Sequence, residues 1–335
     1  GDNGQGKTNL LDAIYHLSYT KSFFNSIDIQ NVMFDESLYV IQGAVKNEQE
    51  EYKLYCGLKK GEKKIFKKNK KIYKKLADHI GFFPVVMITP YDINLILEGS
   101  ETRRRFFDAL IAQFDKNYLF ELLQYNKLLK QRNAFLKTNT SSVDLLEVYD
   151  EQMIEKAQSI HESRKKFIDE FIPIFNKFYQ DISSNKEGVD LDYQSALHEN
   201  TMKELFIQNR AKDQLVGHTS SGIHRDDFLF SINSNPLKKF GSQGQQKTYL
   251  IALKLAKFEY IKLKKNVNPV LLLDDIFDKL DDHRVGYILN LIEKNNLGQT
   301  FITDTSKEKI PQILANLNIE SNLFWIENGN SSKLN

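Results

Sequence analysis

The first nine residues carry the strongest chemical signal in the chain, the run Gly1-Asp2-Asn3-Gly4-Gln5-Gly6-Lys7-Thr8-Asn9. A glycine, four further residues and then Gly-Lys-Thr make the phosphate-binding loop pattern, in which successive N–H groups curl around the phosphates of a nucleotide. We expect Lys7 to place its charge on the β- and γ-phosphates and the Thr8 hydroxyl to bind Mg²⁺. A Gly-rich turn without a ligand is the alternative.

Two acids follow an aliphatic run in the stretch Val270-Leu-Leu-Leu-Asp-Asp. A continuous apolar run is typical of a buried parallel strand, and ligands bind at the carboxyl ends of such strands. We therefore expect Asp274 to hold the Mg²⁺ that Thr8 also contacts, and Asp275 to orient or deprotonate an attacking water. This pairing predicts a nucleoside triphosphatase, and a strand-end turn without chemistry is the alternative.

A turn of small and amide residues leads directly into an apolar-periodic helix, in the stretch Lys239-Phe-Gly-Ser-Gln-Gly-Gln-Gln-Lys. Ser242 and the neighbouring N–H groups would lie at the N-terminus of that helix, which is a second site suited to an anion. The stretch Gly222-Ile-His-Arg-Asp-Asp precedes this turn, and we expect it to belong to the same half of the site.

Lysine is dense between Lys59 and Lys75, where a single glutamate stands among the lysines. Turn residues at positions 61–62 and 69–70 predict a basic β-hairpin. One interpretation is contact with a nucleic-acid backbone. The side chains expected to make it are Lys63, Lys64, Lys67, Lys68, Lys70 and Lys71. The other interpretation is a solvated hairpin whose lysines protect an edge strand.

The hydrophobic pattern predicts the elements that must position these groups. Strands are expected over residues 38–45, 51–58 and 82–90, and a helix over residues 10–19. Two long antiparallel helices are expected between residues 106 and 178, with a break near residues 138–142. A phosphate-binding loop normally follows a buried strand, and no residue precedes Gly1. We therefore expect a truncated chain that lacks an N-terminal strand.

Composition limits the class of protein. The 335 residues carry a net charge of only +2, so a basic surface must be local. The single cysteine, Cys56, excludes a disulfide framework and a Cys-based zinc site, which indicates a reducing, cytoplasmic compartment. No apolar run reaches the length of a membrane span, and the seven histidines show no metal-ligand spacing.

Three of these stretches together resemble the RecF family, bacterial recombination mediators related to SMC proteins. They are Gly-x-Asn-Gly-x-Gly-Lys-Thr-Asn-Leu-Leu-Asp-Ala-Ile, Gly-Ser-x-Gly-Gln-Gln-Lys and Leu-Leu-Leu-Asp-Asp-Ile-Phe-x-x-Leu-Asp. The resemblance covers nearly the whole chain. It implies an α/β fold: an ABC-type P-loop ATPase head over residues 1–100 and 215–335, with a helical, short coiled-coil-like lobe over residues 101–214.

The resemblance also implies the roles of individual residues. Residues 1–9 would be the Walker A loop that binds ATP, and Thr8 and Asp274 would hold Mg²⁺. Asp274 and Asp275 would be the Walker B pair, and Asp281 would lie in the D-loop. The ABC signature would consist of Ser242, Gln243, Gly244 and Gln245. Since a signature closes over ATP that another subunit holds, an ATP-dependent head-to-tail homodimer is implied.

The function that the resemblance implies is ATP-dependent recombination mediation in single-strand gap repair and replication restart. Such a protein would bind DNA at double-strand/single-strand junctions, hydrolyse ATP slowly with stimulation by DNA, and help RecR and RecO to load recombinase. Two alternatives stay open. One is a binding module in which ATP is structural, and the other is the head of a different SMC-like branch, such as a defence ATPase.

Overall fold

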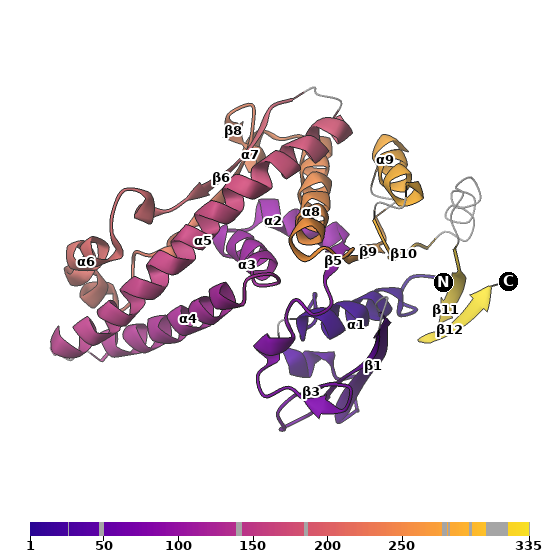
Figure 1. The fold of residues 1–335 in the computed structure, drawn as a ribbon, viewed down its shortest axis with the longest axis horizontal. Helices are drawn as coiled ribbons and strands as arrows, with labels where there is room; N and C mark the ends of the chain where they lie inside the picture. Colours follow the sequence, from indigo (N-terminus) through magenta and orange to yellow (C-terminus); the bar gives the residue numbers. More distant parts are fainter. Residues whose placement is uncertain are drawn as a thin grey trace. The chain divides into compact units, whose positions relative to one another are not determined.

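The computed structural model describes residues 1–25, 27–46, 50–138, 143–183, 187–276, 280, 282–294, 297–305 and 321–334. For residues 143, 144, 282 and 283 it describes the backbone alone. The chain forms two compact units, unit 1 from Gly1–Tyr91 and Lys257–Asn335, and unit 2 from Asp92–Ala256 (Figure 1). The boundaries expected at residues 100 and 214 differ from this division and stay a prediction.

A parallel sheet in unit 1 has the strand order β10-β9-β5. Its strands are β5 (Val85–Ile88), β9 (Val270–Asp274) and β10 (Thr300–Thr303). Every residue of β5 and β9 is buried, because apolar side chains cover both faces of the sheet. The aliphatic run before the two acids is therefore the buried strand that the sequence predicts.

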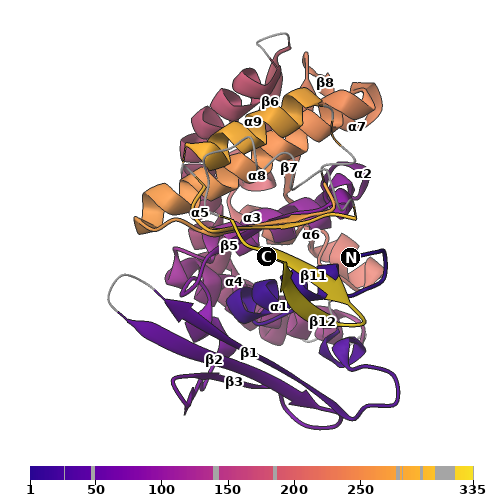
Figure 2. The ribbon, with the colours of Figure 1, turned by 90° about the vertical axis from the view of Figure 1, so that its right-hand side faces the viewer.

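Helix α1 (Lys7–Tyr19) lies between this sheet and a second, antiparallel sheet (Figure 2). The second sheet has the order β1-β2-β3-β4, and its strands are β1 (Leu38–Lys46), β2 (Glu51–Lys59), β3 (Ile65–Lys68) and β4 (Lys71–Ile72). Leu17 of α1 packs on its inner face with Leu54, Cys56 and Phe66. The approach at Gly43 is close, since a Cβ there would lie 2.7 Å from the Leu17 side chain.

The predicted basic hairpin is confirmed in β3 and β4. Asn69 and Lys70 form its turn with φ of 46° and 68°, the left-handed conformation that two-residue hairpin turns require. The other described elements of unit 1 are η1 (Asp28–Asn31), η2 (Leu76–His79), α9 (Asp282–Glu293) and the hairpin β11 (Leu323–Glu327)–β12 (Asn330–Leu334).

Unit 2 combines helices with a small antiparallel sheet of order β6-β7-β8. The strands are β6 (Val189–Gln194), β7 (Asp227–Ile232) and β8 (Asn235–Pro236). The longer helices are α3 (Ser100–Ile111), α4 (Lys116–Leu136), α5 (Val143–Ser183), α6 (Met202–Val216) and α8 (Gln243–Lys265), the last of which continues into unit 1. The short elements are η3 (Pro90–Ile93), α2 (Asn94–Leu97), η4 (Ala196–His198), η5 (Ile223–Arg225) and α7 (Leu237–Phe240).

The long helices α4 and α5 lie side by side (Figure 1). They are the predicted pair, but the sequence pattern did not separate α3 from α4. Asp115 divides these two helices, because its carboxylate accepts the Tyr118 N–H at 2.8 Å and caps α4. The prediction of only one break in this region is therefore wrong. The break expected near residues 138–142 falls mostly outside the described residues.

Candidate nucleotide-binding site

The phosphate loop (residues 1–9) lines one side of a cavity of about 170 Å³ through residues 3–9, and Asp274, Asp275, Thr303 and Thr305 line the rest. Gly4 and Gly6 have φ of 77° and 103°, which side chains rarely tolerate, and Gly6 is the N-cap of α1. Leu10 donates to the Gly6 carbonyl, so the N–H groups ahead of it at the start of α1 have no carbonyl partner within the helix. Such a helix start favours an anion.

The two predicted Mg²⁺ ligands meet at this cavity although they are far apart in the sequence. The Thr8 hydroxyl donates to Asp274 Oδ1 at 3.0 Å, and the Thr303 hydroxyl donates to the same oxygen at 2.7 Å. In the described residues, no three His, Cys, Asp or Glu side chains converge as a metal cluster. One carboxylate and one hydroxyl suit Mg²⁺, which keeps waters and takes its other ligands from phosphates.

Asp275 lines the same cavity in an unusual backbone conformation. Its φ is 50°, which is rare for a residue with a side chain and often marks a functional site. The Asp275 N–H donates to both oxygens of Thr303, at 3.3 Å to the carbonyl and 3.2 Å to the hydroxyl. The end of β10 therefore fixes both acids. No role for Thr303 was predicted from the sequence.

Lys7 extends back over its own loop. Its ammonium donates to the carbonyls of Gly1 and Asp2, the latter at 2.7 Å. Both acceptors are neutral, and an ammonium forms a stronger hydrogen bond when the acceptor is an ionised phosphate oxygen. Lys7 is therefore positioned to exchange these carbonyls for a bound anion.

The turn of the β11–β12 hairpin contacts the phosphate loop at Gln5. The Asn328 N–H donates to Gln5 Oε1 at 2.7 Å, and the Gly329 N–H donates to the Gln5 carbonyl at 3.1 Å. Both turn residues are left-handed, with φ of 49° and 75°. The Asn-Gly pair is the sequence signal that could have predicted this turn, but nothing in the sequence linked it to Gln5.

We predict that Gln5→Met weakens nucleotide binding about three- to tenfold, the contribution of one hydrogen bond that fixes the loop. The change keeps the length of the side chain and removes the acceptor for Asn328. Titration with a fluorescent ATP analogue measures the effect. Gln299→Met, at an exposed position before β10, is the matched control. Equal affinities for Gln5→Met and the wild type would contradict the role of the turn.

The expected signature lies in unit 2, at the start of α8. Ser242 and Gln245 cap each other: the Ser242 hydroxyl accepts the Gln245 N–H at 3.2 Å, and the Gln245 side chain accepts the Ser242 N–H at 2.7 Å. Ser242 and Gln243 are exposed, and Gly244 is half-buried. The turn therefore presents a capped helix N-terminus at the surface. Asp281, the expected D-loop residue, lies outside the described residues.

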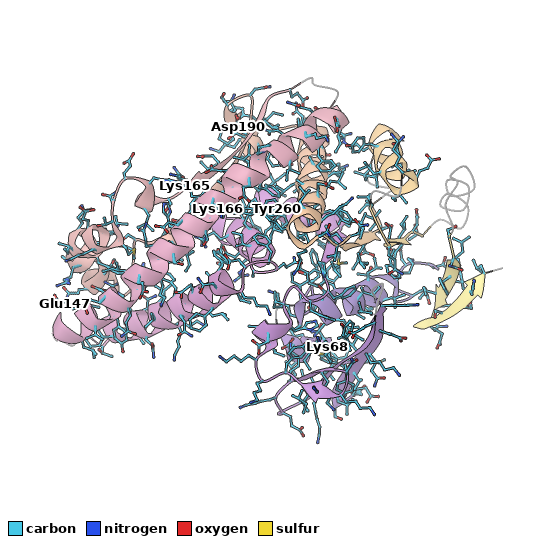
Figure 3. The ribbon with its side chains drawn as sticks, viewed as in Figure 1. Lys68, Glu147, Lys165, Lys166, Asp190 and Tyr260 are labelled. Carbon is cyan, nitrogen blue, oxygen red and sulfur yellow. The ribbon has the colours of Figure 1, made fainter. Side chains whose placement is uncertain are left out.

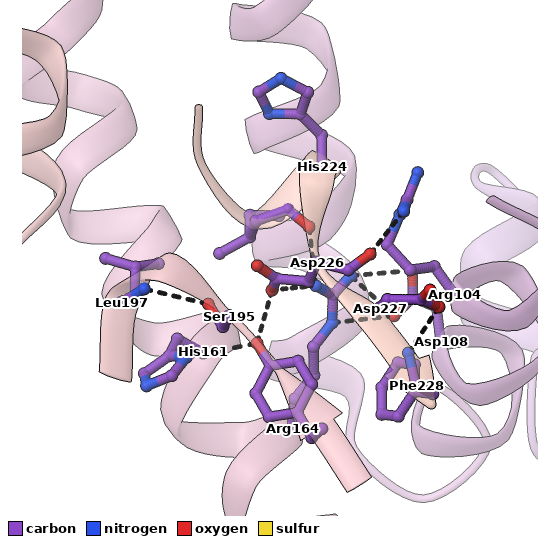
Figure 4. Close-up of polar contacts among 12 residues, drawn as sticks. Arg104, Asp108, His161, Arg164, Ser195, Leu197, His224, Asp226, Asp227 and Phe228 are labelled. Carbon is purple, nitrogen blue, oxygen red and sulfur yellow. Dashed lines mark hydrogen bonds and ion pairs between the residues drawn. The ribbon is translucent and has the colours of Figure 1, made fainter. Parts of the chain in front are cut away.

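Ion pairs join the stretch from Gly222 to Asp227 to helices α3 and α5 of unit 2. Arg164 of α5 is 1% exposed and pairs with Asp226 at 2.8 Å and with Asp108 at 3.0 Å (Figure 4). Arg103 pairs through two nitrogens with Asp227, at 2.8 Å each. Burial raises the pKa of Asp226, and the Arg164 guanidinium opposes that rise. The expectation that this stretch belongs to the nucleotide site stays a prediction.

The six lysines of the basic hairpin do not share one face. Lys63, Lys70 and Lys71 are exposed. Lys67 and Lys68 are half-buried on opposite faces of the sheet, because adjacent strand positions alternate. Lys68 is labelled in Figure 3.

Lys64 differs from the other five because it points into the protein. Its side chain is 8% exposed, and its ammonium lies 2.5 Å from the Asp28 carboxylate.

The described helices include none that is both long and apolar enough to cross a bilayer.

Comparison with known proteins places these features in a family. The model of the RecF/RecN/SMC N-terminal domain matches residues 1–322. The chain is 50% identical over 318 residues to a DNA replication and repair protein RecF of Flavobacterium johnsoniae, covering 94% of this chain and 89% of that protein. It is 47% identical over 332 residues to the RecF of Phocaeicola vulgatus, covering 98% and 90% respectively.

Solved structures agree with these matches. A structure of the recombination mediator RecF with ATP, in the RecFOR pathway, has a TM-score of 0.89 and 35% identity, covering 100% of this chain and 90% of that one. An SMC head domain from Pyrococcus furiosus has a TM-score of 0.52 at 15% identity, covering 100% and 88%, which shows a shared fold only. The α/β ABC-type head expected from the sequence is confirmed.

Proposed function

Since this chain belongs to the RecF family of SMC-like ABC ATPases, we propose that it is an ATP-dependent DNA-binding recombination mediator. The observation that carries the proposal is the contact of Thr8 with Asp274 at the mouth of the phosphate loop. The alternative of a different SMC-like branch loses its support, because the matched relatives are RecF proteins over about nine tenths of their length.

In the proposed reaction, residues 1–9 hold the triphosphate of ATP through their N–H groups. Lys7 exchanges its carbonyl partners for the β- and γ-phosphates. Mg²⁺, held by Thr8 and Asp274, would neutralise phosphate charge. Asp275 orients the attacking water and accepts its proton. We propose slow hydrolysis that DNA stimulates, as the family resemblance implies.

We further propose that ATP joins two copies of the chain head to tail. Ser242 to Gln245 of one copy would cap the nucleotide that Lys7 of the other copy holds, and Asp281 would contact the partner. The exposed, capped start of α8 supports this arrangement, since such a helix end favours an anion. A ligand that contacts both copies must stabilise the dimer by linkage.

We predict that Ser242→Arg prevents ATP-dependent dimerisation, because a long cationic side chain would block the capping turn. Analytical ultracentrifugation with and without ATP measures the mass. The wild type should dimerise with ATP, and the variant should stay a monomer in both conditions. Ser332→Arg, at an exposed position in β12, is the matched control and should behave as the wild type. A wild type that stays monomeric with ATP would refute the arrangement.

DNA and the proteins RecR and RecO are the proposed macromolecular partners, with a preference for double-strand/single-strand junctions. The ATP-bound relative is described as part of the RecFOR pathway, which supports this assignment. The exposed lysines of the basic hairpin supply charge for phosphate contacts. Because Lys64 pairs with Asp28, and Lys67 and Lys68 are half-buried, the DNA proposal rests on the exposed Lys63, Lys70 and Lys71 of the predicted set.

We predict that Lys70→Glu/Lys71→Glu weakens junction DNA binding and flattens its salt dependence by about two units of log–log slope, since each phosphate contact contributes about 0.9. Fluorescence anisotropy at several salt concentrations measures both quantities. Lys203→Glu/Lys212→Glu, which changes two exposed lysines of α6, is the control. If the slope of the hairpin variant equals that of the wild type, these lysines do not contact DNA.

A further inference from the structure

The outer face of the antiparallel sheet in unit 1 carries large exposed aliphatic side chains. The burial pattern of β1 alternates along its whole length, so every second residue points away from α1. Leu38 and Val40 of β1 are each 46% exposed, Ile65 of β3 is 40% exposed, and Ile72 of β4 is 61% exposed. The solvated face of an antiparallel sheet is normally polar, so a run of aliphatic side chains there needs an explanation.

Strand register brings these side chains together into one patch, which we call the outer patch. Val40 pairs with Gly57, and Gly57 pairs with Ile65, so the three lie in one row across the sheet. A Cβ on Gly57 would lie 2.7 Å from the Tyr55 hydroxyl, which shows that the Tyr55 ring lies across the glycine. The centre of the outer patch is therefore an aromatic ring between two exposed aliphatic side chains.

Lysines surround this centre on the same face. Tyr55 pairs across the strands with Lys67, whose ammonium lies 4.8 Å from the centre of the ring. Lys53 and Lys59 occupy outward positions of β2 on either side of Tyr55, and both are exposed, although Lys59 also pairs with Glu62 at 2.9 Å. An apolar centre with an aromatic side chain and a charged rim is the usual composition of a protein–protein interface.

Four kinds of occupant can be compared on this chemistry. A second copy of the same patch would bring lysines against lysines, which disfavours self-association. Bases of single-stranded DNA would need an open ring face, but Gly57 lies against one face of Tyr55 and Lys67 lies over the ring. A DNA backbone offers nothing apolar to Val40 and Ile65. A protein surface with an apolar centre and an acidic rim satisfies both the aliphatic side chains and the lysines.

We propose that the outer patch docks a protein partner whose contact surface has an apolar centre ringed by Asp and Glu. The proposal rests on the proposed function in one respect, because RecR and RecO of the same organism are the partners it would take. It assigns the outer face of the sheet to protein, and leaves the exposed Lys70 and Lys71 at the β3–β4 turn to DNA.

The test is a calorimetric titration of the full chain with purified RecR and, separately, with purified RecO, in ATP and Mg²⁺. The test variant is Val40→Ser/Ile65→Ser, which removes two exposed aliphatic side chains from the patch. The matched control is Ile207→Ser/Leu215→Ser, which makes the same kind of change at exposed positions of α6. Junction DNA binding is measured on all three proteins.

We expect the test variant to bind RecR or RecO about tenfold more weakly or worse, while its DNA affinity stays within about twofold of the wild type. The control should bind as the wild type does. If the test variant binds RecR and RecO with wild-type affinity, the outer-patch proposal is wrong, and the proposed function is unaffected. A parallel loss of DNA binding would also overturn it and assign the patch to nucleic acid. A wild-type chain that binds neither protein would refute the partner assignment in the proposed function and this proposal with it.

Discussion

Asp275→Asn is expected to lower the rate of ATP hydrolysis at least about a hundredfold while ATP still binds, because a positioned base contributes about 10²- to 10⁴-fold to such reactions. The amide keeps the size of the side chain and cannot take a proton from water. Asparagine also tolerates the left-handed backbone of this position, where φ is 50°, so the end of β9 should keep its conformation. Asp274, with its hydroxyl partners, is unchanged.

Steady-state phosphate release measures the rate, and binding of a fluorescent ATP analogue measures affinity. Asp35→Asn is a close control, because Asp35 is exposed and also left-handed, with φ of 66°. If Asp275→Asn hydrolyses ATP at the wild-type rate, the result would favour the alternative that the protein is a binding module in which ATP is structural.

Arg164→Met is expected to destabilise the protein by about 3–5 kcal/mol, the usual cost of removing one partner of a buried ion pair. The change leaves the buried Asp226 carboxylate without its cation and removes the ion pair between Arg164 and Asp108. These three side chains come from α3, from α5 and from the stretch that leads into β7. Loss of the guanidinium should therefore loosen unit 2, in which the capping turn at Ser242 lies.

Urea unfolding followed by circular dichroism, together with hydrogen exchange of α3 and α5, measures this effect. Arg105→Met is the control, since Arg105 is 73% exposed and pairs with Glu101 at the surface. Exposed ion pairs contribute about 0–1 kcal/mol, so this variant should unfold near the wild-type midpoint. Equal midpoints for Arg164→Met and Arg105→Met would show that the buried network does not hold unit 2 together.

The sequence predicted those parts of the fold and site that a local residue pattern and the chemistry of the side chains both indicate. The sequence predicted a helix over residues 10–19, directly after the phosphate loop, and α1 begins three residues earlier, at Lys7. The aliphatic run predicted the buried strand that ends at Asp274. The sequence also paired Thr8 with Asp274, because a phosphate-loop hydroxyl and a strand-end carboxylate serve the same cation. The roles of the predicted site residues in binding and hydrolysis stay predictions.

The missed break at Asp115 is local, but the other features that the sequence did not predict depend on contacts between distant segments. Thr303 and the Asn328–Gly329 turn act through tertiary hydrogen bonds that no local pattern encodes. The inward position of Lys64 depends on Asp28, an acid far from the lysine-rich stretch. Asp226 belongs to a stretch expected at the nucleotide site, and its buried ion pair with Arg164 is a further contact that the local sequence does not encode.

The claim on which the account depends is that two copies share each ATP, one through Lys7 and the other through Ser242. The most direct measurement is ATP hydrolysis by Lys7→Ala and Ser242→Arg, each alone and mixed. Each variant alone should be inactive. A mixed dimer regains one intact site, so an equal mixture should recover about a quarter of the wild-type rate. If the mixture stays inactive at every ratio although both variants are folded, the two groups do not act on one nucleotide across a dimer.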